Sequence, residues 1–261
     1  MTNFATAKDG VRIAYDLVGE GAETIVLVHG FGSSRVQNWR DPGWYETLTK
    51  AGQRVVALDC RGHGESDKPH RSEGYRHDEM ANDVLAVMDD ADVAVATVMG
   101  YSMGGFIAIP LTIAHPERVK KLVVGGVGES YLGGTAAVRD RVADPQVRAG
   151  IVAALRTDDP SSIANPTAKG FRAFADQPGK DRLALAACMS APSVNLPAAT
   201  LATARRPVLV VCGAKDDLTG PPDPLARAFP GGRAVTVPNR DHMTVVGDKL
   251  YKQAVLDFLL T

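Results

Sequence analysis

Residues 93–114 read VAVATVMGYSMGGFIAIPLTIA. Val93–Met99 is a short apolar run rich in valine, which predicts a buried strand, and Met103–Ala114 predicts an apolar helix. Between them, G-x-S-x-G places Ser102 in a tight turn with glycines on both sides. Larger side chains at the flanking positions would collide with neighbouring backbone in such a turn. The stretch therefore predicts a strand, a sharp turn and a helix, with the Ser102 hydroxyl exposed at the edge of a sheet.

This turn gives Ser102 the surroundings of a nucleophile. The N–H of Met103 and the start of the following helix point towards any negative charge that forms beside the hydroxyl. The motif alone is a weak signal, because glycine and serine are common residues. Its alternative interpretation is a glycine-rich turn in which the serine caps the helix.

Short β-like runs alternate with helical patterns on either side of this stretch. Because the β runs are continuous and apolar, they predict parallel strands joined by crossover helices, that is, an α/β fold with a doubly wound sheet. In such sheets ligands bind outside the carboxyl ends of the strands, so the residues after each strand carry the chemistry. The further expected strands are Val11–Val18, Thr24–Val28, Arg54–Leu58, Lys121–Val124, Val208–Cys212 and Ala234–Val237, and the further helices Glu46–Ala51, Tyr75–Asp89, Leu225–Phe229 and Val245–Leu260.

The alternation stops between Gly126 and Pro207. This segment contains no convincing strand, and a loop of that length is unlikely to lack structure. We expect a core domain made of residues 1–126 and 207–261, with residues 127–206 forming a helical cap over the carboxyl edge of the sheet. The expected cap helices are Ala136–Val142, Gln146–Leu155, Lys169–Ala175 and Asp181–Met189.

The loop after Thr24–Val28 reads His29-Gly30-Phe31-Gly32. A loop of this kind after an early strand supplies a second backbone N–H for a tetrahedral oxyanion, and here Phe31 is the expected donor beside Met103. The competing interpretation is a dinucleotide or phosphate loop. It fails because G-x-G-x-x-G ends here in Arg35, and no GK[ST] motif occurs. We expect His29 to orient the loop.

An acid and a base follow two later strands. Asp216 comes just after Val208–Cys212 and is the expected carboxylate, with Asp217 as a solvated neighbour and Glu129 as a third possible acid. His242 lies in the loop beyond the last strand. The chain order Ser102, Asp216, His242 is that of a nucleophile, acid and base on an α/β sheet, which is far more specific than any one residue.

Metal chemistry has little support in the sequence. His63, His70 and His77 recur every seven residues, but Pro69 and Gly74 break any helix that would place them on one face. The three cysteines, Cys60, Cys188 and Cys212, match neither a zinc pattern nor a disulfide framework. We expect no metal and no organic cofactor.

Composition and charge limit the classes of binding partner that we expect. The 261 residues carry a formal net charge of −1 without long runs of one sign, which argues against nucleic acid or an anionic membrane as a partner. No segment approaches the about 20 apolar residues of a membrane span, and the N-terminal residues lack the apolar core of a signal peptide. The sequence predicts a cytoplasmic monomer or homodimer that acts on a small-molecule acyl substrate.

Together these motifs resemble the α/β-hydrolase superfamily. The resemblance covers nearly the whole chain outside the cap and implies an eight-stranded, mostly parallel sheet. It is greatest to the capped esterases, haloperoxidase-like enzymes and C–C hydrolases, while a serine at the elbow argues against haloalkane dehalogenases, which have aspartate there. The motifs are H-G-F-G at His29–Gly32, D-x-R-G-H-G-x-S at Asp59–Ser66, G-Y-S-M-G-G at Gly100–Gly105, G-x-x-D at Gly213–Asp216 and D-H at Asp241-His242.

The expected activity is hydrolysis of a small, mostly apolar carboxylic ester. Ser102 attacks the acyl carbonyl, His242 takes its proton, and Asp216 orients the imidazole. The N–H groups of Phe31 and Met103 hold the oxyanion, and water then hydrolyses the acyl-enzyme. Two alternatives stay open: C–C or amide hydrolysis by the same triad, and a slow-turnover ligand sensor on the same fold. The sequence does not identify substrate-binding residues.

Overall fold

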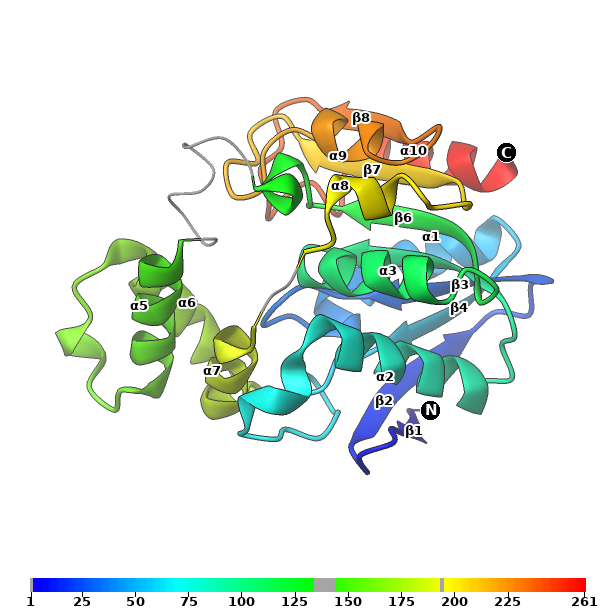
Figure 1. The fold of residues 1–261 in the computed structure, drawn as a ribbon. Helices are drawn as coiled ribbons and strands as arrows, with labels where there is room; N and C mark the ends of the chain where they lie inside the picture. The colour runs from blue at the N-terminus through cyan, green and yellow to red at the C-terminus, as the bar shows by residue number, and fades with distance from the viewer. Residues whose placement is uncertain (1, 134–143, 193–194) are drawn as a thin grey trace.

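The computed structural model describes residues 2–133, 144–192 and 195–261. These contain one eight-stranded sheet in the order β1-β2-β4-β3-β5-β6-β7-β8 (Figure 1). The strands are β1 (Asn3–Thr6), β2 (Arg12–Val18), β3 (Glu23–Val28), β4 (Gln53–Leu58), β5 (Ala96–Tyr101), β6 (Val119–Gly125), β7 (Val208–Gly213) and β8 (Arg233–Val237).

Strand β2 runs antiparallel to both of its neighbours. It pairs with β1, to which a tight turn joins it, and with β4 on its other side. From β4 to β8 all neighbours are parallel, as in the pairing of Val26 in β3 with Val98 in β5. The predicted mostly parallel, eight-stranded α/β sheet is therefore confirmed. The carboxyl ends of β3, β5, β6 and β7 meet at one edge.

Helices cover both faces of the sheet (Figure 1). One apolar core joins the sheet to α2, α3 and α9 and includes Met80, Ile107 and Leu225. The core on the other face contains Trp44 and Leu48 of α1 and Tyr251 of α10. These helices are α1 (Trp44–Lys50), α2 (His77–Asp90), α3 (Met103–Ala114), α9 (Asp223–Arg227) and α10 (Lys249–Leu260). Short turns of helix flank them at η1 (Val36–Arg40), η2 (Ser72–Tyr75) and η3 (Glu129–Leu132).

The chain between β6 and β7 is a helical insertion that stands away from the sheet (Figure 1). Its helices α5 (Pro145–Arg156), α6 (Pro166–Ala175) and α7 (Arg182–Ser190) begin after Asp144, Asn165 and Asp181, whose side chains accept backbone N–H bonds. They share a small apolar core of their own. The short η5 (Pro160–Ser162) lies among them, and α8 (Ala198–Leu201) returns the chain to the sheet core through Leu201.

The insertion agrees with the sequence in its helices. The helix expected over 136–142 lies outside the described residues. The division of the chain at 127–206 stays a prediction, since η3 and α8 fall inside those bounds but pack with the core: η3 lies against α9, and Leu201 is buried beside the sheet.

The main differences from the sequence prediction concern β1, β5 and α10. β1 was missed, because a four-residue edge strand carries too little apolar pattern to be detected. β5 starts at Ala96 rather than Val93. Val93 is buried in the preceding loop, where its N–H donates a hydrogen bond to the carbonyl of Met88 at 2.8 Å. α10 starts at Lys249 rather than Val245, after its cap Asp248.

Across the described ranges, no helix is both long and apolar enough to cross a membrane.

Candidate active site

The turn after β5 is strained in the way that G-x-S-x-G predicts. Ser102 has φ 51° and ψ −117°, a conformation that residues with a side chain rarely adopt. A Cβ added at Gly100 would lie 2.2 Å from the carbonyl oxygen of Gly104, and one added at Gly104 would lie 2.0 Å from that of Val28. Both glycines are required because backbone passes directly beside them. The result fixes Ser102 at the start of α3.

Three side chains expected from the sequence meet in a continuous relay. The Oγ of Ser102 lies 3.0 Å from Nε2 of His242, and Nδ1 of His242 lies 2.8 Å from Oδ2 of Asp216. The other carboxylate oxygen of Asp216 accepts the N–H groups of Leu218 and Thr219 at 3.2 and 3.1 Å. Asp216 is thus held rigidly, and the arrangement has the form of a nucleophile, a base and an orienting acid.

The alternative acids lie elsewhere. Asp217 is exposed, whereas Asp216 is 5% exposed. Glu129 packs against Gly220, where its Cγ would be 2.6 Å from an added Cβ. Among the described residues, Asp216 is the carboxylate that reaches His242.

Tyr101, which the sequence did not single out, holds the loop that carries His242. Its hydroxyl donates a hydrogen bond to the backbone carbonyl of His242, and the two rings are 5.5 Å apart between centroids. Tyr101 is the variable residue of G-x-S-x-G, so no motif marks it. Through Tyr101, the same turn that holds the serine also holds the histidine loop.

The proposed oxyanion donors are the backbone N–H groups of Phe31 and Met103. Within the part of the chain that the structure describes, neither donates to another protein group. The loop that carries Phe31 is fixed at Gly30, whose N–H donates to the Asn38 side chain at 3.1 Å. His29 accepts the N–H of Cys60 through Nε2 at 2.9 Å, so its Nδ1 donates to the Gly30 carbonyl at 2.7 Å. This agrees with the orienting role expected for His29.

Burial lowers the pKa of His29 to about 4 and that of His63 to about 3. The His29 and His63 rings make an edge contact with their centroids 5.1 Å apart, and the His63 and Phe31 ring centroids are 5.8 Å apart. Both side chains are therefore neutral at physiological pH, and protonation of either would place a charge behind the oxyanion loop.

This pair predicts a loss of stability in acid. The unfolded chain titrates these histidines near pH 6.5, above their folded pKa values, so below that pH the unfolded state binds more protons. The free energy of unfolding should fall by about 3 kcal/mol per histidine as the pH drops from about 6.5 to about 4. Urea unfolding of the protein and of His63→Gln at several pH values measures this. The variant should show a shallower dependence on pH, and equal slopes would contradict the prediction.

The other candidate histidines do not gather at one place. His63 is buried beside the oxyanion loop, His70 pairs with Asp181 of the insertion at 3.0 Å, and His77 lies by Phe106. The described residues contain no group of three or more His, Cys, Asp or Glu side chains that could hold a metal ion. All three cysteines are buried as free thiols.

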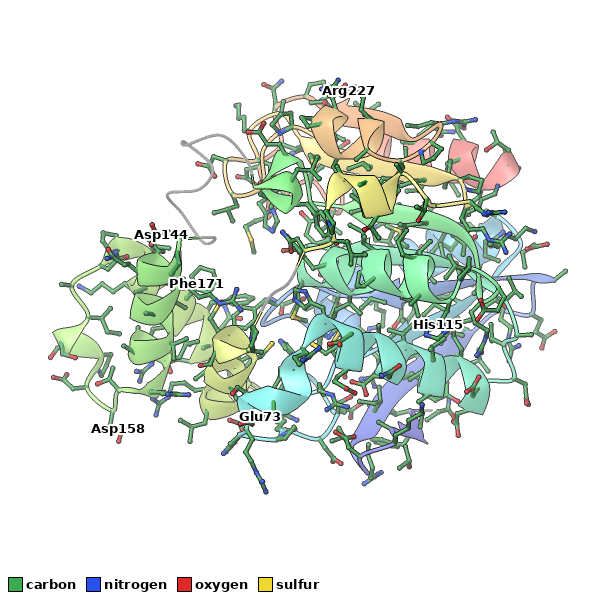
Figure 2. All side chains as sticks on the ribbon, viewed as in Figure 1. Glu73, His115, Asp144, Asp158, Phe171 and Arg227 are labelled. Atoms are coloured by element: carbon green, nitrogen blue, oxygen red, sulfur yellow. The ribbon has the colours of Figure 1, made fainter. Side chains whose placement is uncertain are left out.

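Two contacts join the helical insertion to residues beside the triad. Phe171 of α6, labelled in Figure 2, lies 5.9 Å from the Phe31 ring. Cys188 of α7 places its sulfur 3.8 Å from that of Met103, next to the nucleophile. These two apolar contacts bring α6 against the oxyanion loop and α7 against the catalytic turn.

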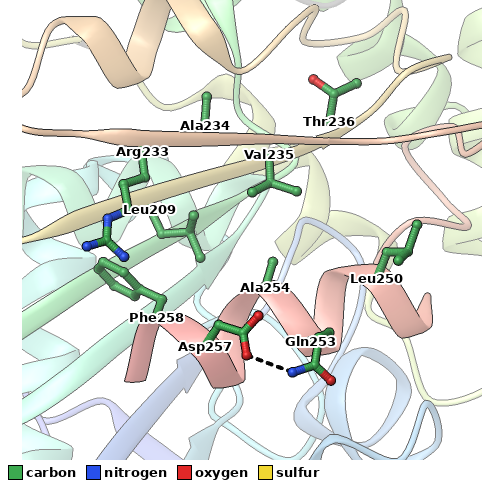
Figure 3. Close-up of a pocket in the computed structure, with 10 residues that line it drawn as sticks. All are labelled: Leu209, Arg233, Ala234, Val235, Thr236, Leu250, Gln253, Ala254, Asp257 and Phe258. Carbon is green, nitrogen blue, oxygen red and sulfur yellow. Dashed lines mark hydrogen bonds between the residues drawn. The ribbon is translucent and has the colours of Figure 1, made fainter. Parts of the chain in front are cut away.

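A hollow of about 450 Å³ lies away from this site, between β8 and α10 (Figure 3). Its lining includes Leu209, Arg233 and Phe258, together with the hydrogen-bonded pair Gln253 and Asp257. No triad residue lines it, so it has no part in the chemistry considered above.

Known proteins match this chain in sequence and in structure. A family model described as alpha/beta hydrolase fold matches residues 23–160, more than half of the chain. The 2-hydroxy-6-oxononadienedioate/2-hydroxy-6-oxononatrienedioate hydrolase of Escherichia coli O81 (strain ED1a) is 39% identical over 132 residues, 48% of this chain and 43% of that relative. The chain thus covers less than half the length of this curated relative.

Two solved structures resemble the whole chain. A hydrolase from Pseudomonas aeruginosa PA01 has a TM-score of 0.80 and 28% identity, covering 100% of this chain and 98% of its own. Est816, described as an N-acyl homoserine lactone degrading enzyme, has a TM-score of 0.75 and 26% identity, covering 98% of this chain and 100% of its own. Both similarities therefore extend through the helical insertion.

Proposed function

Because the chain belongs to the α/β-hydrolase fold family, we propose that it is a serine hydrolase that attacks a carbonyl carbon through Ser102. The relay of 3.0 and 2.8 Å from Ser102 through His242 to Asp216 carries this proposal. A neutral histidine at that distance takes the hydroxyl proton as oxygen attacks, and a buried carboxylate favours the resulting imidazolium. The N–H groups of Phe31 and Met103, which have no protein acceptor among the described residues, lie on the neighbouring loop and turn.

The steps use only groups of this chain and water. Ser102 adds to the carbonyl, and its proton passes to Nε2 of His242. The N–H groups of Phe31 and Met103 hold the oxyanion, each worth about 10²–10³ in rate. Collapse expels the leaving group, which takes the proton from His242, and leaves an acyl-Ser102. Water, deprotonated by His242, then releases the carboxylic acid and restores the serine.

The first candidate for the bond that breaks is a C–C bond beside a ketone. Support comes from the 39% identity to hydrolases named for 2-hydroxy-6-oxononadienedioate. In such a substrate the enol must first convert to its keto form. The enol O–H loses its proton, and the carbon next to the ketone gains one. The electrons of the breaking bond then delocalise into the remaining enone, and the dienol leaves while Ser102 keeps the acyl group.

The second candidate is an ester or lactone, the reaction that the sequence alone led us to expect. Support comes from Est816, named for degrading a lactone, whose likeness to this chain includes the insertion over the site. The same relay serves this reaction with an alkoxide as the leaving group. In this proposal the apolar side chains of Phe171 and Cys188, which contact Phe31 and Met103, line the acyl site.

A paired substrate assay tests these candidates. The protein is assayed with 2-hydroxy-6-oxononadienedioate, whose consumption is followed through the loss of its conjugated absorbance. It is assayed separately with p-nitrophenyl esters from acetate to octanoate. We expect repeated turnover of the dienedioate with a higher kcat/KM than for any ester. Higher kcat/KM for the esters would replace the first candidate by the second. One slow event without further turnover on every substrate would contradict the proposal and indicate a ligand sensor.

A further inference from the structure

Phe174 of α6 lies on the oxyanion loop, residues 29–32. A Cβ added at Gly32 would lie 2.6 Å from Cε1 of the Phe174 ring and 2.9 Å from Cδ1, so an edge of the ring contacts the Gly32 backbone. Gly32 has φ 69°, a conformation that favours glycine, and it follows Phe31, the expected oxyanion donor. One turn earlier on α6, the Phe171 ring lies 5.9 Å from that of Phe31. Two aromatic residues of one helix therefore cover two successive residues of this loop.

Hydrogen bonds hold the oxyanion loop on either side of these two residues. The N–H of Gly30 donates to the Asn38 side chain at 3.1 Å, and the N–H of Ser33 donates to the Gly30 carbonyl at 3.2 Å. Among the described residues, neither Phe31 nor Gly32 donates its own N–H to a protein acceptor. The positions of these two N–H groups therefore depend on packing, and α6 supplies that packing from the insertion.

Lys180, in the connection between α6 and α7, lies over the ring that makes this contact. Its Nζ is 3.2 Å from the centroid of the Phe174 ring, and it donates to Oε1 of Gln177 at 2.9 Å. No carboxylate of residues 2–133, 144–192 or 195–261 lies within 4 Å of this ammonium. A cation is attracted to the face of an aromatic ring, most strongly where water is partly excluded. Lys180 therefore holds the Phe174 ring in its place against the loop.

The charge of Lys180 depends on pH within an accessible range. Burial lowers the pKa of its ammonium to about 8. The core groups that its charge reaches are His29 and His63, whose low pKa values of about 4 and about 3 leave both rings neutral there. The adjacent carboxylate of Asp181 is engaged with His70 at 3.0 Å and with N–H groups of α7. The cation over the ring is therefore present below about pH 8 and is lost as the pH rises through that value.

We propose that Phe174 and Lys180 are positioning residues for the oxyanion site: the cation holds the ring, and the ring holds the Phe31 N–H where the oxyanion forms. The step that depends on them is attack by Ser102, when negative charge develops on the carbonyl oxygen and preset N–H groups stabilise it. A displaced loop would still bind substrate but would meet the transition state poorly, since a misplacement of about 1 Å can cost 10²-fold in rate. This inference rests on the proposed function, because it assigns the Phe31 N–H to the oxyanion.

Labelling by an alkyl fluorophosphonate tests the proposal without a natural substrate. Oγ of Ser102 forms a bond to phosphorus, the P–F bond breaks to release fluoride, and His242 takes the hydroxyl proton, while the phosphoryl oxygen occupies the oxyanion site. The second-order rate constant of labelling should fall by about tenfold in Phe174→Ala, because the donor loop is no longer held. Phe174→Tyr keeps the aromatic face and should restore most of the rate. A rate constant in Phe174→Ala equal to that of the wild type would overturn the proposal.

The dependence of labelling on pH separates positioning from structural support alone. In the wild type the rate constant should fall about three- to tenfold as the pH rises through about 8, because the attraction of the cation for the ring is lost. Lys180→Arg stays charged, so its rate constant should stay level to about pH 9.5. Lys180→Gln should be slow at every pH, whereas Lys169→Gln, which removes an exposed lysine of α6, should follow the wild type. Identical alkaline profiles for the wild type and Lys180→Arg would overturn the proposal.

Hydrogen exchange separates this inference from the proposed function, since it needs no reaction at Ser102. A peptide spanning residues 28–39 reports the N–H groups of Gly30 and Ser33, which are hydrogen-bonded in the wild type. This peptide should exchange about threefold faster or more in Phe174→Ala, because the loop opens more often. Equal exchange in the two proteins would overturn the positioning role even if Ser102 is labelled. Faster exchange in the variant, with no labelling of the wild type, would support the loop contact and count against the serine hydrolase instead.

Discussion

Ser102→Ala should reduce kcat by about 10⁴-fold or more on any substrate that the protein turns over, because no other group forms the covalent intermediate. The Oγ removed is the atom that lies 3.0 Å from His242. Some rate over the uncatalysed reaction should persist, since the N–H groups of Phe31 and Met103 still polarise a bound carbonyl. Binding should change little.

The measurement compares wild type, Ser102→Ala and Ser162→Ala with the ester series and the dienedioate. Ser162 is an exposed serine of η5, and its loss should leave the rates within about twofold, as for most surface changes. Melting temperatures show whether the fold is kept. Equal product release by wild type and Ser102→Ala would show that Ser102 is not the nucleophile, and the central proposal would be wrong.

The triad residues could be named from the sequence because each follows a strand of a parallel sheet. Ser102 follows β5, Asp216 follows β7 and His242 follows β8, and the carboxyl ends of parallel strands meet at one edge. The glycines around Ser102 added a steric requirement that few other stretches meet. Chain order and local backbone geometry therefore selected three residues whose side chains the structure places within hydrogen-bonding distance of one another, and their catalytic roles stay a prediction.

Other parts of the site have no local signal. Tyr101 holds His242 through a contact 141 positions along the chain, and its place in G-x-S-x-G accepts any residue. Cys188 reaches Met103 only because the insertion packs against the core and α7 ends beside the catalytic turn. Their importance lies in what surrounds them, and a sequence of ordinary helical residues does not record that.

The errors in the fold have a similar origin. Val93 and Val95 read as strand because they are apolar and β-branched, yet Val93 is buried in a loop and Val95 is 47% exposed. Packing against the end of α2, rather than pairing in the sheet, accounts for the buried one. Propensity thus identified β5 but could not set its first residue, since burial in a loop and burial in a strand select the same side chains.

Asp216→Asn should reduce kcat/KM by about 10⁴-fold while keeping the fold. The substitution preserves the shape of the side chain, and an amide oxygen can still accept the N–H groups of Leu218 and Thr219. It removes the acceptor for Nδ1–H of His242 that now lies at 2.8 Å. An amide nitrogen facing Nδ1 favours the tautomer with its proton on Nε2, and such a histidine cannot take the proton of Ser102.

Asp217→Asn is the matched control, since it changes the adjacent, exposed carboxylate by the same atoms. Its kcat/KM should stay within about twofold of the wild type. Glu129→Gln tests the remaining acid that the sequence allowed. If Asp216→Asn kept its activity while Glu129→Gln lost it, the acid would be misassigned even though Asp216 touches His242. A loss confined to Asp216→Asn instead shows that the 2.8 Å contact sets the tautomer on which proton transfer from Ser102 depends.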